Sequence, residues 1–192
     1  MPYRSDTFTK GQYYHVYNRG AGKKRIFLND GNYDYLLLLI NRYHQKYGAT
    51  AIAFCLMPNH YHFLLRQETD EPLSKFMGVM FNTYVQALNL QQGRSGTLFE
   101  GRFKHVHVEK WEYLLHLCRY IHLNPVKANL VAHAEEWPYS NYREWIGVRN
   151  ATLSDQKFIR DHYPDLGDYA RYITDGEDEK KSYKHIAKYM ID

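Results

Sequence analysis

TAIAFCLMPNHYHFLLRQ, at residues 50–67, is the stretch of sequence that decides the fold. Its two halves, residues 50–57 and 61–67, are rich in aliphatic and aromatic side chains, which predicts two strands. The break falls at Pro58-Asn59, because proline cannot donate a hydrogen bond to a central sheet ladder. We therefore expect the second strand to open with the residues His60-Tyr61-His62.

Patterns on both sides of this stretch predict the remaining elements. In chain order they are a strand at residues 12–18, a helix between Asn29 and Gly48, a helix from Pro72 to Gly93, a strand or loop at 97–102, a strand at 103–109 and a helix at 111–124. The last helix should end there because the residue before a proline, here Pro125, is pushed out of helical geometry. This order predicts an α+β fold, in which helices pack on a mainly antiparallel sheet.

Length and composition indicate one main domain. The chain has 192 residues and is 44% hydrophobic, so it can bury a full core but hardly two. We assign residues 1–149 to this domain and residues 150–192 to a small helical C-terminal appendage. Cys55 and Cys118 each lie in an apolar run, as expected of reduced thiols in a cytoplasmic protein. We expect no secretion, because the first 20 residues contain no apolar signal region. We expect no membrane insertion, because the longest strongly apolar run, Leu36 to Ile40, is far shorter than the roughly 20 residues that a membrane span needs.

The charge of the chain is unevenly distributed. Residues 1–150 carry 18 Lys and Arg against 12 Asp and Glu, whereas residues 151–192 carry 7 against 9, including an acidic cluster at residues 175–179. The chain also has 19 Tyr and 9 Phe. Cations that hold phosphates and rings that stack on unpaired bases favour a nucleic-acid partner.

His60 and His62 are the first candidate site residues. Two positions apart at the start of a strand, their imidazoles leave the same face, so they can share one metal ion while Tyr61 and Phe63 enter the core. By itself this spacing is more typical of ordinary hydrogen-bonded histidines. His105 and His107 repeat it on another predicted strand, where we favour a surface or DNA-facing role.

A second set of candidates lies on the helix at residues 111–124. His116, Tyr120 and Asn124 recur every four residues and so share one helical face. Taken alone, this stripe is more typical of a tyrosine whose ring lies in the core and of a polar residue that ends the helix before Pro125.

The two sets together resemble the REP-associated tyrosine transposases, a branch of the single-tyrosine HUH transposases. The resemblance spans roughly residues 8–148. Its supporting stretches are YHVYNRG, FCLMPNHYHFLL, GTLFEGRFKHVHVE, LLHLCRYIHLNPVKANLV and WPYSNY. It implies a ferredoxin-like or RRM-like antiparallel sheet, in agreement with the predicted element order. It also implies an enzyme that nicks and joins single-stranded DNA near REP-like hairpins.

The resemblance implies a role for each candidate. His60 and His62 would bind a divalent metal with Asn124 as third ligand, and Tyr120 would be the nucleophile that forms a 5′-phosphotyrosine. Two imidazoles and an amide oxygen suit Mg²⁺ or Mn²⁺ better than structural Zn²⁺. A phosphotyrosine bond retains the energy of the cut phosphodiester, so a tyrosine nucleophile favours strand transfer over degradation.

Basic and aromatic residues near these motifs are candidates for DNA contacts. Cationic side chains fix the DNA backbone and an aromatic ring can stack on a base. The candidates are Arg19, Arg102, Lys104, Lys127 and Phe103. His15 is expected to be a core or hydrogen-bonded histidine, although it could face the His60 strand across the sheet.

Several alternatives remain open at this point. A metal-dependent nuclease would use water as nucleophile and leave Tyr120 structural, and a domesticated DNA-hairpin-binding protein would not cut at all. A purely structural protein explains neither set of residues. We expect a monomer, with a dimer as the alternative, in the bacterial cytoplasm and associated with the nucleoid.

Overall fold

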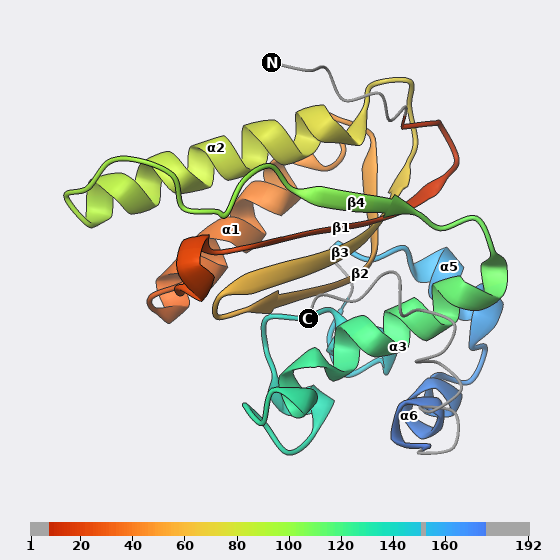
Figure 1. The fold of residues 1–192 in the computed structure, drawn as a ribbon. Helices are drawn as coiled ribbons and strands as arrows, with labels where there is room; N and C mark the ends of the chain where they lie inside the picture. Colours follow the sequence, from red (N-terminus) through yellow and green to blue (C-terminus); the bar gives the residue numbers. More distant parts are fainter. Residues whose placement is uncertain (1–7, 151–152, 176–192) are drawn as a thin grey trace.

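A computed structural model describes residues 8–150 and 153–175 of the chain, and the structural statements below concern this part. Its centre is a four-stranded antiparallel sheet (Figure 1). The strands are β1 (Tyr13–Arg19), β2 (Ala49–Met57), β3 (His60–Gln67) and β4 (Lys104–His107), in the order β2-β3-β1-β4. The predicted α+β fold with an antiparallel sheet is confirmed.

Two long helices cover one face of the sheet, above it in Figure 1. They are α1 (Asp30–Tyr43) and α2 (Leu73–Gln91). Asn29 caps α1, and its side chain accepts a hydrogen bond from the backbone N–H of Asn32. Tyr61, Phe63 and the apolar sides of both helices form a common core.

The other face is covered by α3 (Trp111–Lys127) and the helices that follow it (Figure 1). These are α4 (Tyr142–Trp145), α5 (Gln156–His162) and α6 (Leu166–Thr174), with short 3-10 turns η1 (Ala21–Lys23) and η2 (Ala134–Glu136) elsewhere. The second core lies here, between β2, β3 and α3 to α6. Within the described ranges, no helix has the length and apolar character needed to cross a membrane.

Two element boundaries differ from the sequence prediction. Helix α3 continues through Pro125 to Lys127, whereas the sequence predicted its end at Asn124. Only one short turn follows the proline, and the backbone N–H of Ala128 still donates to the carbonyl of Asn124, so little hydrogen bonding is lost. Strand β4 is only four residues long, and residues 97–102 add a single bridge between Gly20 and Phe99.

The described part of the C-terminal segment contains the two helices α5 and α6. Phe158, Ile159, Tyr169 and Ile173, from α5 and α6, are buried in the same core as α3. The proposed division into domains at residue 150 stays a prediction. Most of the acidic cluster at residues 175–179 lies outside the described residues, as does the remainder of the appendage to residue 192.

Asn141 closes the outer edge of β2. Its side-chain oxygen accepts the backbone N–H of Phe54 at 2.7 Å, and its amide nitrogen donates to the carbonyl of Ile52 at 2.8 Å. Nε2 of His122 lies 2.9 Å from the same oxygen, and Nδ1 of His122 lies 2.6 Å from the hydroxyl of Tyr169. This network joins β2, α3 and α6. It also provides hydrogen-bond partners for the backbone groups of Ile52 and Phe54 at the outer edge of β2.

Replacing Asn141 by Ala should therefore destabilise the fold. The change leaves the buried N–H of Phe54 and Nε2 of His122 without their partner, while the carbonyl of Ile52 keeps only its bond from Trp145. We therefore expect the free energy of unfolding to fall by about 3 kcal/mol. Urea denaturation followed by circular dichroism measures this. Asn82→Ala, an exposed site on α2, is the control and should change stability by less than about 0.5 kcal/mol.

The same network predicts a pH dependence of stability. Burial lowers the pKa of His122 from 6.5 to about 4, partly offset by its hydrogen bond to Asn141. As pH falls from 6.5 toward 4, the unfolded chain takes up a proton that the folded chain does not, so stability is lost in this window. At pH 5 the loss relative to pH 7 is about 2 kcal/mol.

The measurement is urea unfolding at pH 7 and pH 5. In His122→Gln the pH-dependent loss should be smaller than in the wild type by about 2 kcal/mol, whereas the exposed-site change His133→Gln should retain the wild-type loss. Equal losses in all three proteins would contradict the assignment of this effect to His122.

Candidate active site

The histidines of β3 lie on the sheet face that carries α3. His60 and His62 alternate with Tyr61 and Phe63, which enter the opposite core. The ring centroids of the two histidines are 5.1 Å apart and the rings are nearly perpendicular. The expectation that both imidazoles leave one face is therefore confirmed.

His62 is fully buried and has one unused nitrogen. Its Nδ1 lies 3.0 Å from Nε2 of His15 on β1, and the two rings are stacked. Its Nε2 has no hydrogen-bond partner within the described part of the chain. Burial holds the pKa of His62 well below 6.5, and the neighbouring His15 and His60 lower it further, so the ring is neutral.

His60 lies at the edge of this buried region. Its Nδ1 is 2.7 Å from the side-chain oxygen of Asn59. Burial lowers its pKa to about 4, a hydrogen bond with the Asn124 side chain acts in the opposite direction, and Arg19 lowers it. The hydrogen bond brings Asn124 of α3 to the histidine pair.

Tyr120 packs directly on the histidine pair. Its ring meets the ring of His62 edge to face at a centroid distance of 5.4 Å, and only 5% of its surface is exposed. Lys127 lies about two helical turns further along α3, and its Nζ is 5.6 Å from the centroid of the same ring. The amide nitrogen of Asn124 donates to the carbonyl of Tyr120 at 2.9 Å, which leaves its oxygen for His60.

Polar contacts on the rest of α3 fix the helix to α6. Arg119 donates to the carbonyls of Ile173 and Asp175, and His116 lies 2.6 Å from the hydroxyl of Tyr172. His116, which shares the helical stripe of Tyr120, thus contacts α6. Nothing in the sequence pattern identified Tyr172 or Tyr169 as partners of this helix.

The donor set of this site fits a divalent ion. In the described ranges no three His, Cys, Asp or Glu side chains are grouped to hold a metal, so an ion here would need the amide oxygen of Asn124 beside His60 and His62. The buried, unused Nε2 of His62 is the observation that supports the fit. Binding requires that His62 donate its Nδ1–H to His15, which leaves a lone pair on Nε2.

The second pair of histidines lies on the other face of the sheet. His105 is opposite Val16 and His107 opposite Tyr14 in the β1–β4 register, and both of these β1 residues belong to the core under α1 and α2. Neither can reach the His60 and His62 pair through the sheet. Nε2 of His107 instead contacts the side chain of Gln12.

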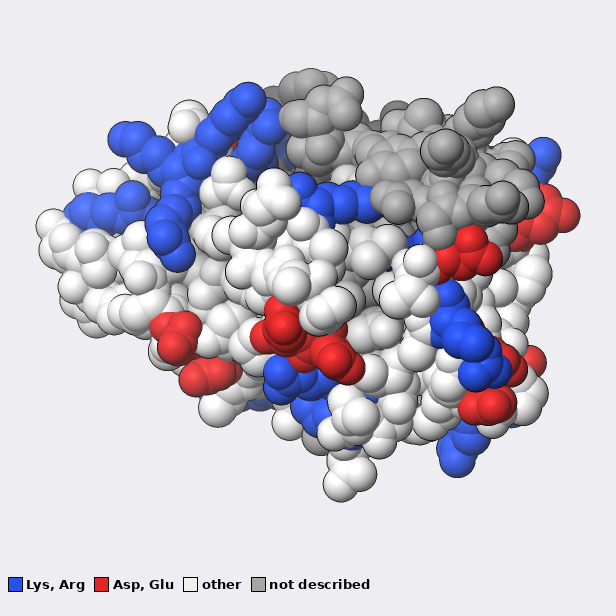
Figure 2. Space-filling view, turned by 90° about the horizontal axis from the view of Figure 1, so that it is seen from below, with Lys and Arg blue, Asp and Glu red and all other residues white. Residues whose placement is uncertain are grey.

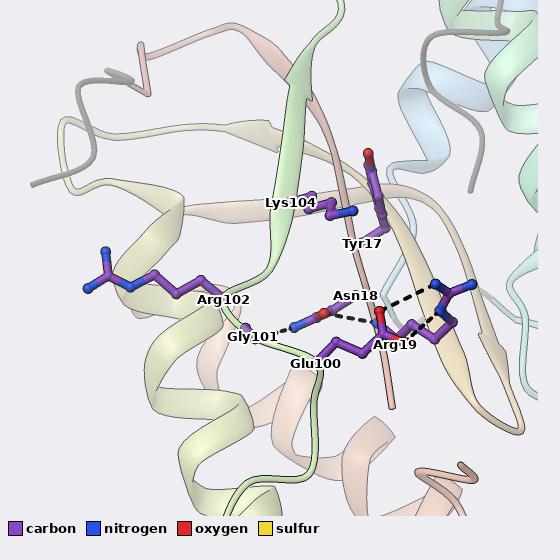
Figure 3. Close-up of a pocket in the computed structure, with 7 residues that line it drawn as sticks. All are labelled: Tyr17, Asn18, Arg19, Glu100, Gly101, Arg102 and Lys104. Atoms are coloured by element: carbon purple, nitrogen blue, oxygen red, sulfur yellow. Dashed lines mark hydrogen bonds and ion pairs between the residues drawn. The ribbon is translucent and has the colours of Figure 1, made fainter. Parts of the chain in front are cut away.

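A pocket of about 260 Å³ is lined in part by β1 (Figure 3), whose Tyr17 and Arg19 lie opposite His62 and His60 in the sheet. It brings together three of the predicted DNA-contact residues, and its lining consists of Tyr17, Asn18, Arg19, Glu100, Gly101, Arg102 and Lys104. Arg19 forms a two-point ion pair with Glu100, a residue that the sequence did not single out. Arg102 extends away from the other labelled side chains.

The other predicted DNA contacts lie outside this pocket. Lys127 is at the C-terminal end of α3 beside Tyr120. Phe103 packs partly against the core under α1 and α2. Seen from below, Lys and Arg side chains gather at one end of the molecule, while Asp and Glu form separate smaller groups (Figure 2).

Comparison with known proteins identifies relatives of the chain. The family model described as "Transposase IS200 like" matches residues 8–124. The fold is similar to a solved structure of a REP-associated tyrosine transposase bound to a REP hairpin, with a TM-score of 0.64 and 18% identity over 81% of this chain and 98% of that chain. A tRNA(His) guanylyltransferase from Saccharomyces cerevisiae has a TM-score of 0.46 and 13% identity, covering 97% of this chain and 81% of that chain. Among proteins of curated function, none matches the sequence significantly.

Proposed function

The chain belongs to the IS200-like transposase family, and from this we propose that it cuts and rejoins single-stranded DNA through a covalent bond to Tyr120. One observation carries the proposal. The ring of Tyr120 lies edge to face on His62, whose buried Nε2 has no hydrogen-bond partner in the described part of the chain. The ring of the proposed nucleophile thus lies against a neutral imidazole whose Nε2 can accept a ligand.

His60, His62 and Asn124 are the residues that would hold a divalent ion. Imidazole ligands favour Mn²⁺, whereas an amide oxygen and water also suit Mg²⁺, so we propose one of these two ions. A bound ion would withdraw charge from a non-bridging phosphate oxygen and so ease attack on the phosphorus. His15 would fix the orientation and tautomer of His62 by accepting its Nδ1–H.

Tyr120 supplies the covalent step. Its hydroxyl oxygen loses its proton and forms a bond to phosphorus, the bond from phosphorus to the 3′ oxygen breaks, and that oxygen takes up a proton. The product is a 5′-phosphotyrosine with a separate 3′-hydroxyl. A 3′-hydroxyl that attacks the phosphotyrosine reverses these changes and joins two strands, so no external energy source is needed.

Hairpin DNA of the REP type is the proposed partner. The solved structure with a similar fold is described as bound to a REP hairpin. In this chain Arg19, Arg102, Lys104 and Lys127 would contact phosphates, and Phe103 would stack on a base. Tyr120, His60 and His62 come together within one chain, which supports a monomer over a dimer.

Replacing Tyr120 by Phe should abolish covalent attachment. The phenyl ring keeps the packing on His62 but lacks the nucleophile, so we expect adduct formation to fall by at least about 10³-fold while DNA affinity stays close to wild type. Single-stranded hairpin DNA labelled at the 5′ or 3′ end is incubated with Mg²⁺ or Mn²⁺, and adducts that resist denaturation are counted.

Tyr113→Phe is the matched control, because it makes the same change two turns earlier on α3; it should form the adduct at the wild-type rate. Cleavage that persists in Tyr120→Phe would favour a nuclease that uses water. Binding without cleavage in the wild type would favour a DNA-binding protein that does not cut.

Metal binding is tested separately from activity. His60→Ala removes one proposed ligand, and we expect Mn²⁺ affinity, measured by titration calorimetry, to fall by more than about 10-fold. The control is the double change His105→Ala and His107→Ala, which has the same spacing on the opposite face and should leave Mn²⁺ affinity unchanged. Equal Mn²⁺ affinity in wild type and His60→Ala would contradict the assignment of His60 as a metal ligand.

A further inference from the structure

The pocket lined in part by β1 contains an acidic group that phosphate binding does not require. We propose that this pocket binds one unpaired guanine base of the DNA strand, with Glu100 as the residue that selects it. The inference rests on the proposed function, because it assigns base selection to the same site. Four steps support it: the place of the pocket, the anchoring of Glu100, its hydrogen-bonding chemistry and the aromatic wall.

The pocket is one cross-strand step away from the proposed catalytic histidines. In the register of the sheet, Tyr17 lies opposite His62 on one side and opposite Lys104 on the other, and Arg19 lies opposite His60. Opposed residues share a face and are direct neighbours. A strand whose phosphate is at the histidine pair therefore has a neighbouring nucleotide within reach of this pocket.

Glu100 is held in place by the backbone around it. Its backbone N–H donates to the carbonyl of Arg19 at 3.0 Å, and the side chain of Asn18 donates to the carbonyl of Gly101, also at 3.0 Å. The Glu100 carboxylate meets Nε and Nη2 of Arg19 at 3.2 and 3.3 Å. The carboxylate is thus oriented before any ligand arrives, as a selective contact requires.

A carboxylate selects among unpaired bases by what it can accept. The two-point pair with Arg19 uses the acceptor sites of both oxygens that point to one side, and guanine needs the same two sites. Guanine would therefore replace Arg19 on the carboxylate, and the released guanidinium would contact the DNA phosphate. Guanine presents two adjacent donors on its pairing edge, a ring N–H and an amino group, which match two carboxylate oxygens. Adenine and cytosine present one amino group beside an acceptor nitrogen, and thymine one N–H between two carbonyls, so each repels part of the carboxylate.

Tyr17 and Lys104 complete the pocket on the side away from Glu100 (Figure 3). The Tyr17 ring is half-buried and lies against the ring of His15 at 4.9 Å, which keeps it in a fixed orientation. A fixed aromatic ring offers a stacking surface for a base. Lys104 is exposed and adds a cation for the attached phosphate. Solvated phosphate alone would explain Lys104 and Arg19 but not the paired carboxylate.

The test measures binding by the full chain in EDTA, so that no DNA is cut. Labelled oligo-dT carrying one central dG, dI, dA or dC is compared with oligo-dT alone by fluorescence anisotropy. We expect the dG strand to bind about 10-fold more tightly than the others. Inosine is the sharpest comparison, because it lacks only the amino group of guanine and needs no change to the protein.

Glu100→Gln should reduce the preference for dG over dI to near one, because the amide offers one acceptor in place of two. Glu109→Gln makes the same change of charge at an exposed site just after β4 and should keep the wild-type preference. Equal binding of dG and dI by the wild type, or an unchanged preference in Glu100→Gln, overturns the inference. Failure of the proposed function is distinct, since it appears as a missing adduct whatever the base preference.

Discussion

The contact between Tyr120 and His62 depends on the two-residue period of strand β3. Tyr61 and Phe63 are almost completely buried under α1 and α2, and this packing fixes which way the strand faces. A shift of register by one residue would turn the apolar pair toward α3 and the histidines into the first core. The hydrophobic side of β3 therefore holds the imidazoles in position, although it makes no contact with them across the sheet.

Helix α3 supplies the other half of the site, and its position depends on polar contacts deep in the second core. Arg119 and His122 lie on the sides of the helix that bind α6 and Asn141, while Tyr120 and Asn124 face the histidines. His122 is neutral and both of its ring nitrogens have partners, whereas Arg119 is a buried guanidinium that donates to the carbonyls of Ile173 and Asp175. The segment after residue 150 thereby contributes to the placement of the candidate nucleophile.

Much of this arrangement could be predicted from the sequence, and the exceptions have physical causes. The strand period placed His60 and His62 on one face, and the four-residue spacing placed Tyr120 and Asn124 on one side of α3. The predicted end of α3 at Asn124 was wrong. A proline disfavours helical geometry in the residue before it, but this preference is weak and α3 continues for only two residues beyond Pro125. The partners of α3 on α6 and the Arg19–Glu100 pair could not be predicted, because both join segments whose contact is set by tertiary packing.

The two parts of the site differ in electrostatic character, and the difference follows from where α3 packs. On β2 and β3 the helix excludes water, so His62 and Tyr120 are buried and the imidazoles stay neutral. Neutral ligands bind an ion without first losing a proton. On β1 and beside β4 the pocket stays open and the side chains are charged, as contacts with a solvated phosphate backbone require. A strand entering from β4 would thus pass from charged, exposed contacts to a dry, neutral site, where attack by water on a phosphotyrosine is least favoured.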